Sequence, residues 1–329
     1  MNADYNIFKN KRFKEIILNP PDYKPGSFKG AGDLLIENGN YWLTSRTRTR
    51  DMRGYEVEIF LSKNGYRFKK IKTISIGELE KELDADLSSI EGQQLLYNRD
   101  KRLYYLYISV DFGSSLSHLW KTILMTSKVP SKDWKNMGVV IEPVAPFNTA
   151  KDFNISYING SYIGICKAYI DAKKQLYAAL FSSKDGIKWK YWGIPKINGK
   201  NQPPIFAIDG KIFEFGNKII FLGSSGNFFK NGLTASDRVC GFEIDLKKMN
   251  FNTLFSQKWK IGSKYENPEC PIHTYCTPVP DYSKKEWKIV IEAIDPEHTR
   301  KLGVFDVVDH VIMYTSKFNK SAENSHFVR

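Results

Sequence analysis

The chain has 329 residues, of which 42% are apolar and 14% aromatic, so it can bury a sizeable core and favours strands over helices. It has no apolar run long enough for a membrane-spanning helix, and its four cysteines are too few for a disulfide framework. The net charge of +13 is spread along the chain as lysine, without a basic arm or a nucleic-acid motif. This pattern indicates a solvated basic surface and argues against a nucleic-acid or membrane partner. The N-terminus lacks an apolar signal region, so we expect a cytoplasmic protein.

An apolar, aromatic-rich strand recurs along the chain, each time after a turn. The five copies are Tyr41–Ser45, Tyr104–Ser109, Tyr162–Cys166, Ile219–Gly223 and Lys288–Glu292. Their starts lie 63, 58, 57 and 69 residues apart, which indicates five units of similar length.

A second series marks the turn that follows in some of these units. The segments Ser62–Phe68 (SKNGYRF) and Ser183–Trp189 (SKDGIKW) are near copies, and Ser127–Trp134 is a looser one. An Asx-Gly pair between apolar runs is a strong hairpin signal. These segments resemble the structural Asp-box turns of sialidases, which lie away from the chemistry. Each unit is therefore predicted to be a small antiparallel sheet of about four strands.

Units of this size and composition are typical of propeller blades, so we predict an all-β, five-bladed β-propeller in a single domain, 1–329. The predicted blades cover 27–76, 88–143, 150–197, 203–262 and 268–318. The last unit lacks a fourth strand, and Phe13–Leu18 matches the missing pattern, so we expect the N-terminal strand to close the last blade. A double β-sandwich is the alternative, but it does not explain five equal units. Only Gly77–Leu87 has a helical pattern.

The first strand of a blade lines the central channel, so its side chains converge on one mouth. Reading back from each recurring strand gives one ionisable residue per unit: Asp33, Glu91, Asp152, Asp209 and His273. Carboxylates this close raise one another's pKa, which can keep one of them protonated as an acid. Most glycoside hydrolases use a pair of carboxyl groups for catalysis.

These motifs resemble the five-bladed propeller glycoside hydrolases of families 43 and 32, with families 117 and 130 as relatives. Gly32-Asp33 followed by Tyr41-Trp42-Leu43 is similar to the first-blade Asp motif of those enzymes, and Asp152 lies two blades later, as in family 43. The residues Glu91-Gly92, followed by Tyr104-Tyr105-Leu106, are similar in sequence to the motif that carries the catalytic acid in family 43. In family 43, however, that Glu belongs to blade four, where this chain has Asp209.

The resemblance implies a glycoside hydrolase, inverting as in family 43, with a carbohydrate as its substrate. We expect Asp33 to act as the base, Glu91 as the acid, and Asp152 as a residue that tunes the pKa of the acid. Asp209 is the reserve candidate for the acid. A phosphorylase of the family 130 kind and a non-catalytic carbohydrate-binding propeller remain alternatives.

Further residues are candidates for substrate binding. They are His273, Trp42 and Arg46, the last of which alternates with Arg48 and Arg50 so that an extended strand would place all three on one face, suited to a carboxylate or phosphate. A zinc site at Cys270, His273 and Cys276 is disfavoured, because a structural zinc takes four ligands. We expect no cofactor, leaving a structural calcium ion in the channel open, and a monomer or small homo-oligomer.

Overall fold

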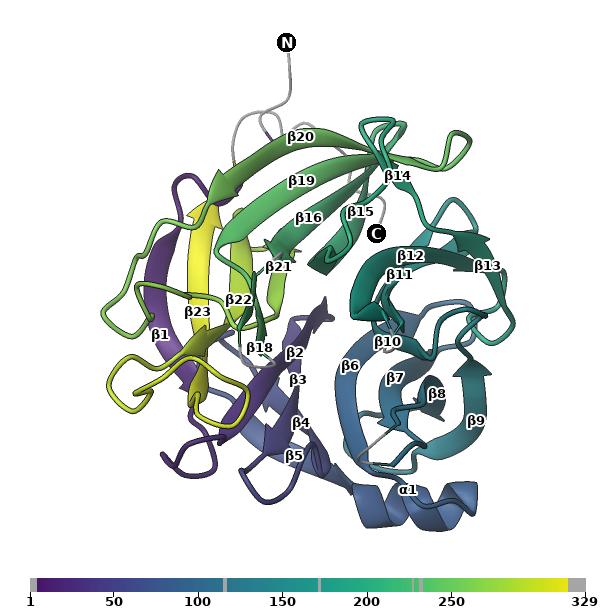
Figure 1. Cartoon of the computed structure of the whole chain (residues 1–329), viewed down its shortest axis with the longest axis horizontal. Coiled ribbons are helices and arrows are strands. Elements are labelled where there is room, and N and C mark those ends of the chain that lie inside the picture. Colours follow the sequence, from purple (N-terminus) through teal and green to yellow (C-terminus); the bar gives the residue numbers. More distant parts are fainter. Residues whose placement is uncertain (1–4, 115–116, 171–172, 227, 231–232, 319–329) are drawn as a thin grey trace.

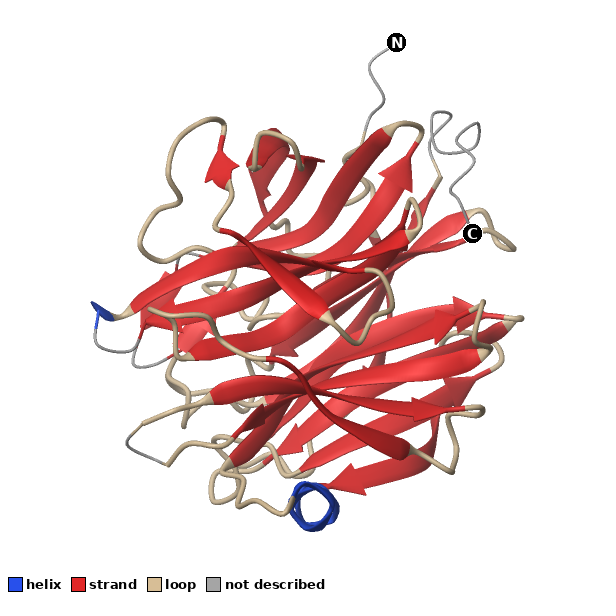
Figure 2. Ribbon diagram, turned by 90° about the vertical axis from the view of Figure 1, so that its right-hand side faces the viewer, coloured by secondary structure: helices blue, strands red, loops and turns tan. Residues whose placement is uncertain are grey.

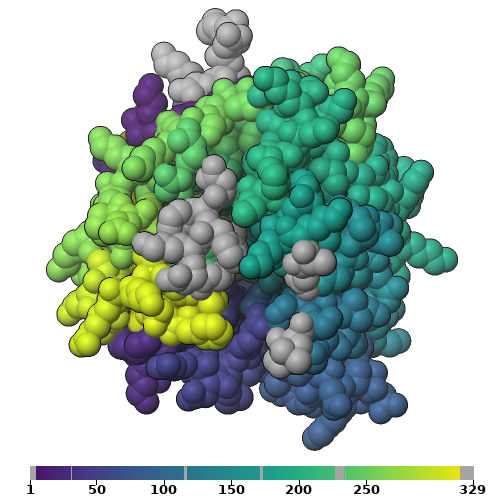
Figure 3. All heavy atoms as spheres, in the orientation of Figure 1, coloured from purple at the N-terminus to yellow at the C-terminus, as the bar shows by residue number. Residues whose placement is uncertain are grey.

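The computed structural model describes residues 5–114, 117–170, 173–226, 228–230 and 233–318. Within these ranges nearly all of the regular secondary structure is β-strand, and α1 is the one α-helix (Figure 2). Most strands pair into antiparallel runs of four, each called a group, and the groups follow one another around the middle of the molecule (Figure 1). In the space-filling view the sequence colours pass around the same face in chain order (Figure 3).

The first three groups each consist of four consecutive strands. Group 1 contains β2 (Phe28–Glu37), β3 (Asn40–Arg48), β4 (Glu56–Ser62) and β5 (Lys69–Ser75). Group 2 contains β6 (Ser89–Asn98), β7 (Leu103–Asp111), β8 (Trp120–Ser127) and β9 (Lys135–Ile141). Group 3 contains β10 (Thr149–Ile158), β11 (Ser161–Ile170), β12 (Gln175–Ser183) and β13 (Trp189–Gly193).

The last two groups carry additions to this plan. Group 4 contains β15 (Ala207–Phe215), β16 (Lys218–Gly226), β19 (Arg238–Asp245) and β20 (Asn250–Lys258), with β14 (Lys196–Ile197) parallel to β20. The hairpin of β17 (Phe228–Lys230) and β18 (Leu233–Ala235) separates β16 from β19. Group 5 contains β21 (Cys276–Asp281), β22 (Glu286–Ile294), β23 (Asp309–Lys317) and β1 (Arg12–Leu18).

The N-terminal strand completes group 5 as predicted. β1 pairs antiparallel with β23, and the register places Arg12 opposite Thr315 and Leu18 opposite Val311. Ile17 of β1 packs against Leu34 of group 1, so this strand also joins the last group to the first.

The first strand of each group lies nearest the middle of the molecule (Figure 1). β2, β6, β10, β15 and β21 contact one another in that order, and β21 also contacts β2. The predicted recurring strands all form the second strand of a group, in β3, β7, β11, β16 and β22.

Each neighbouring pair of groups buries its own apolar cluster. Trp42 of group 1 packs with Leu106 of group 2, and Phe221 of group 4 packs with Ile165 of group 3. Full burial of a side chain such as Phe221 contributes about 1.5–3 kcal/mol, so these contacts hold neighbouring groups in fixed positions. The side chains that reach the middle are therefore positioned by a rigid frame.

Local signals explain the turns and the single helix. In the turn after β12, Ser183 Oγ accepts a hydrogen bond from Gly186 N at 2.9 Å, and Asp185 Oδ1 accepts one from Ile187 N at 2.8 Å. The near-copy after β4 has the same bond between Ser62 and Gly65, also at 2.9 Å. The helix α1 (Ile76–Leu83) begins with a capping box of Ser75 and Glu78. It ends earlier than predicted, because Asp84 adopts a left-handed conformation with φ 49°.

Candidate active site

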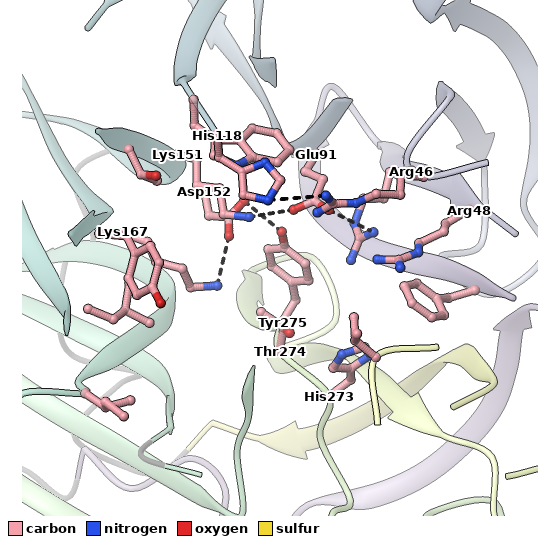
Figure 4. A pocket seen from close by; sticks show the side chains of 18 of the residues that line it. Arg46, Arg48, Glu91, His118, Lys151, Asp152, Lys167, His273, Thr274 and Tyr275 are labelled. Atoms are coloured by element: carbon pink, nitrogen blue, oxygen red, sulfur yellow. Dashed lines mark hydrogen bonds and ion pairs between the residues drawn. The ribbon is translucent and has the colours of Figure 1, made fainter. Parts of the chain in front are cut away.

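The best candidate site is a cavity of about 330 Å³ beside the starts of the first strands β6 and β10, called cavity 1. Its wall combines the start of β6 and β10, the ends of β3 and β11, and the loop before β21 (Figure 4). Its charged lining includes Arg46, Arg48, Glu91, Lys151, Asp152 and Lys167. A concentration of ionisable groups with shifted pKa values in a cavity is a mark of a functional site.

Bulges in the first strands aim side chains into this cavity. The register of β6 shifts between Glu91 and Gln93, and that of β10 shifts between Lys151 and Asn154. Gly92 has φ 46°, and a Cβ there would lie 2.1 Å from Asp152 Oδ1, so only glycine fits. Bulges bend a strand and redirect its side chains, and they are over-represented next to active sites.

Glu91 is a buried carboxylate surrounded by cations. Its Oε2 lies 2.7 Å from Lys151 Nζ, and its Oε1 lies 3.9 Å from Arg46 Nη1 and 4.0 Å from Arg53 Nη2. Burial raises the pKa of Glu91, but Lys151 and then the two arginines outweigh it and hold the pKa well below its usual value. Glu91 is therefore ionised at neutral pH.

Asp152 has both carboxylate oxygens engaged. Lys167 Nζ lies 2.9 Å from Oδ2, and the Tyr275 hydroxyl donates to Oδ1 at 3.0 Å. Burial raises the pKa of Asp152, but Lys167 and Lys151 together outweigh this effect and the pKa is lowered. Asp152 itself has φ 55°, a left-handed conformation that is uncommon outside glycine.

Asp209 differs from Asp152 in that its pKa is raised. It lies on β15, 2.8 Å from Lys167 Nζ, which therefore bridges it to Asp152. Burial raises the pKa of Asp209 to about 6, since Lys167 only partly opposes burial and the negative charge of Asp152 adds to it. Asp209 does not belong to the wall of cavity 1, and it connects to that wall through Lys167.

Asp33 lies outside the wall of cavity 1, contrary to the expectation from the sequence. Its carboxylate is 2.6 Å from Lys211 Nζ, and burial raises its pKa against the effect of that lysine. Asp33 lines a small cavity of about 20 Å³ that shares Asp152 and Tyr275 with cavity 1, but Asp33 is not part of the cavity 1 wall. The structure therefore does not bring Asp33 and Glu91 to the same cavity.

His273 lines cavity 1 and belongs to a second cluster, with the acids Glu292 and Asp309. Its Nδ1 is hydrogen-bonded to Asp309, and Glu292 Oε1 lies 3.8 Å away. Burial lowers the pKa of His273 to about 4, so its imidazole is neutral. Burial also raises the pKa of Glu292 to about 8 and that of Asp309 well above its usual value.

His273, Glu292 and Asp309 form a possible metal-binding cluster. Among the described residues, it is the one place where potential metal-ligand atoms of three His, Cys, Asp or Glu side chains lie within 4.8 Å of one another. Calcium takes six to eight oxygen ligands, whereas this set offers two carboxylates and one imidazole. Arg46 Nη2, 3.6 Å from Glu292, already brings a positive charge. The residues therefore do not fit the calcium ion left open by the sequence, and we assign no metal to them.

The remaining predicted binding residues divide between the cavity and the core. Arg46 and Arg48 line cavity 1, while Arg50 lies beyond the end of β3 and is exposed. The prediction that Trp42 binds substrate is corrected by the structure, because Trp42 is buried among the side chains between groups 1 and 2 and does not line cavity 1. The aromatic residue that reaches the carboxylates is Tyr275 instead.

Sequence reasoning also missed Lys167 and Tyr275. Lys167 is a buried lysine that directly follows the recurring strand Tyr162–Cys166. Lysine is almost never fully buried unless it is paired. A lysine directly after a buried strand was therefore a signal, in the sequence, of a buried ion pair.

A second cavity, of about 580 Å³, opens at the hairpin ends of the first strands and is called cavity 2. Tyr97, Tyr157 and Tyr162 line it, together with Lys211 and the ion pair of Arg99 and Glu37. It is larger than cavity 1 but has no cluster of carboxylates with shifted pKa values among the described residues, so we place the candidate site in cavity 1.

No family model and no curated protein sequence matches the chain. None of the helices described in the structure is long and apolar enough to cross a membrane.

Solved structures with a similar fold are found. The GH32 β-fructofuranosidase of Bombyx mori is 12% identical with a TM-score of 0.64, over 94% of this chain and 64% of that chain. The RS223 β-xylosidase is 11% identical with a TM-score of 0.63, over 92% of this chain and 96% of that one. The β-1,2-mannobiose phosphorylase of Listeria innocua is 15% identical with a TM-score of 0.61, over 94% of this chain and 97% of that one.

This chain thus spans less than two thirds of the length of the Bombyx mori enzyme, but nearly all of the other two. At such low identity the likeness concerns the fold. It confirms, at that level, the resemblance to the propeller glycosidases that the sequence motifs predicted.

Proposed function

We propose that the five groups are the blades of one closed five-bladed propeller, with limits near those predicted from the sequence. Three observations support this interpretation. The first strands contact one another in a ring, each neighbouring pair of groups buries an apolar cluster, and β1 joins the last group to the first.

We infer that the chain is an enzyme that cleaves a glycosidic bond and that cavity 1 is its active site. The observation that carries this inference is a chain of three carboxylates from consecutive first strands. Glu91 is paired with Lys151, Asp152 and Asp209 share Lys167, and the charges of Glu91 and Lys151 in turn affect the pKa of Asp152. The fold likeness to a fructofuranosidase, a xylosidase and a mannobiose phosphorylase supports a carbohydrate as the substrate.

The pKa values favour a particular division of labour. Glycoside hydrolysis needs one carboxyl group that holds a proton and one that is ionised. Asp209, with a pKa of about 6, suits the acid that protonates the leaving oxygen. Glu91, held ionised by its cations, suits the base that activates water or the nucleophile that attacks carbon. Asp152 would tune the pKa of Asp209 through its negative charge and through their shared lysine.

This division changes the roles expected from the sequence. The lowered pKa of Glu91 favours the ionised role over that of proton donor, and the reserve acid Asp209 takes the donor role. Asp33, expected as the base, is paired with Lys211 outside the cavity wall, so we propose a structural role for it in the channel.

Phosphorolysis is the second candidate, and the charge balance of cavity 1 favours it. The wall carries Arg46, Arg48, Arg53, Lys151, Lys167 and Lys174 against the carboxylates Glu91 and Asp152. Such an excess of cations suits an anionic nucleophile, as phosphate would be. In that case phosphate would replace the water that a base activates.

A turnover screen tests both candidates. Purified protein is incubated with aryl glycosides and disaccharides, with and without inorganic phosphate, and the released sugar is identified. A free sugar formed without phosphate supports hydrolysis, and a sugar 1-phosphate formed only with phosphate supports phosphorolysis. Glycan binding without any turnover would overturn both and leave a non-catalytic carbohydrate-binding propeller.

A further inference from the structure

Arg48 is an unusual side chain in the wall of cavity 1. It is only 2% exposed, yet among the described residues no carboxylate oxygen lies within ion-pair distance of its guanidinium, and its Nε has no hydrogen-bond partner. Its guanidinium carbon lies 4.8 Å from the ring centre of Phe28 and 5.7 Å from that of Phe305. Figure 4 shows the side chain reaching toward the cavity without an interaction line.

The other buried or half-buried cations of the cavity each lie beside a carboxyl group. Lys151 is paired with Glu91 at 2.7 Å, and Lys167 lies between Asp152 and Asp209 at 2.9 and 2.8 Å. Arg46 faces Glu91 and Glu292 at 3.9 and 3.6 Å. Of the buried cations described in this wall, Arg48 is thus the one without a carboxylate partner.

An unpaired buried charge destabilises a fold, so its counter-ion is expected to come from elsewhere. Burial lowers the pKa of Arg48 to about 10; the more distant charges of Glu91 and Asp309 oppose this effect, Arg46 and Arg53 add to it, and the group stays protonated at neutral pH. A guanidinium is a planar fork that binds a carboxylate or phosphate through two parallel hydrogen bonds. The platform of Phe28, which also contacts the His273 ring with 5.2 Å between centres, fixes that fork at the cavity.

We propose that Arg48 binds a compact oxyanion carried into cavity 1, and that this group is the carboxylate of an acidic sugar. The proposal deepens the function proposed above, since it names the substrate class of that same site. Free phosphate has the same chemistry as a ligand, so the experiment separates the two sources.

The test is calorimetric binding to the full chain, which does not depend on catalysis. The ligands are methyl glycosides of glucuronic and galacturonic acid, their neutral counterparts methyl glucoside and galactoside, and inorganic phosphate. The proteins are the wild type, Arg48→Gln, Arg48→Lys, and Arg99→Gln as matched control, because Arg99 is paired with Glu37 at cavity 2.

An acidic glycoside should bind the wild type about 10-fold or more tightly than its neutral counterpart, because charged hydrogen bonds are among the strongest. Arg48→Gln should abolish that preference, so that the acidic glycoside binds no more tightly than its neutral counterpart. Arg48→Lys, which keeps the charge but loses the fork, should restore part of it. Arg99→Gln should behave as the wild type, and melting curves should show that every variant is folded.

Other outcomes separate the possibilities. Phosphate binding that is lost in Arg48→Gln, without preference for an acidic sugar, would support the oxyanion site but assign it to free phosphate. Equal binding of every ligand by wild type and a folded Arg48→Gln would overturn the proposal. The turnover screen distinguishes this inference from the proposed function. Cleavage of neutral glycosides alone would support the proposed function and overturn the inference about Arg48.

Discussion

At the scale of single residues, three carboxylates on neighbouring strands differ because their surroundings differ. Glu91 meets Lys151 and two arginines, whereas Asp209 shares one lysine with Asp152. Sequence position predicted that these residues would gather, and Glu91 and Asp152 do line one cavity. It could not predict their protonation, since the lysines that decide it lie elsewhere in the chain.

The proton on Asp209 gives a pH dependence. With a pKa of about 6, Asp209 is protonated below that pH, so wild-type turnover should fall as the pH rises through it. Asp209→Asn should lose this limb, with severe loss on alkyl glycosides and mild loss on aryl glycosides that have good leaving groups. Rates measured across the pH range with both substrate types check this. If Glu91→Gln shows the leaving-group dependence instead, the acid is Glu91.

At the scale of strands, the sequence predicted well where strands occur, but it predicted poorly to which face of the sheet their side chains point. The recurring strands are the second strands of their groups, and β1 pairs with β23, because strand patterns and Asx-Gly turns are local signals. The bulges carry no such signal, and one inserted residue moves the side chains beyond it to the other face. The register of β2 shifts between Ala31 and Leu34, a stretch that includes Asp33, so strand alternation could not predict the direction of that side chain.

The bulge in β6 can be tested at Gly92. A methyl group there would meet Asp152 Oδ1 at 2.1 Å, so Gly92→Ala should displace that carboxylate and lower turnover sharply. The matched control is Gly138→Ala, since Gly138 also has a positive φ, 80°, but open space around its Cβ. The control should lose only about 1–2 kcal/mol of stability from backbone strain. Turnover that is equal in the two folded variants would contradict the role of the bulge.

The closing strand β1 can be tested at Ile17. Ile17→Ala should lower the free energy of unfolding by about 2–5 kcal/mol, because its side chain packs with Leu34 and Val311 between the last and first groups. Glu15→Ala, at an exposed position of the same strand, should change it by less than about 0.5 kcal/mol. Denaturant unfolding of both variants gives the comparison, and equal stabilities would argue against closure by β1.

At the scale of the whole molecule, the five groups bring buried charge together near its middle. The first strands contact one another in chain order, and cavity 1 beside them is lined by Glu91, Asp152 and His273, three of the five predicted ionisable residues. The price of this arrangement is the burial of acids such as Glu292 and Asp309, which came from second and third strands and not from the first strands searched in the sequence.

This burial predicts how stability depends on pH. The pKa of Glu292 is raised from 4.5 to about 8, so between these values the folded chain holds a proton that the unfolded chain has released. The stabilisation is complete below the lower value and is lost as the pH rises through the upper one, by up to about 1.4 kcal/mol per pH unit. Unfolding curves should show this decline in the wild type and in the exposed control Glu142→Gln, and a weaker decline in Glu292→Gln. An equal decline in all three would contradict it.

The proposed cleavage of glycosidic bonds by the carboxylates of cavity 1 is tested by the turnover of Glu91→Gln on a glycoside that the wild type cleaves. Loss of the ionised carboxylate should lower kcat by about 100-fold or more. Glu37→Gln, which removes a carboxylate paired with Arg99 at cavity 2, should keep wild-type turnover. Wild-type turnover by a folded Glu91→Gln, or an equal loss in Glu37→Gln, would contradict the assignment of the active site to cavity 1.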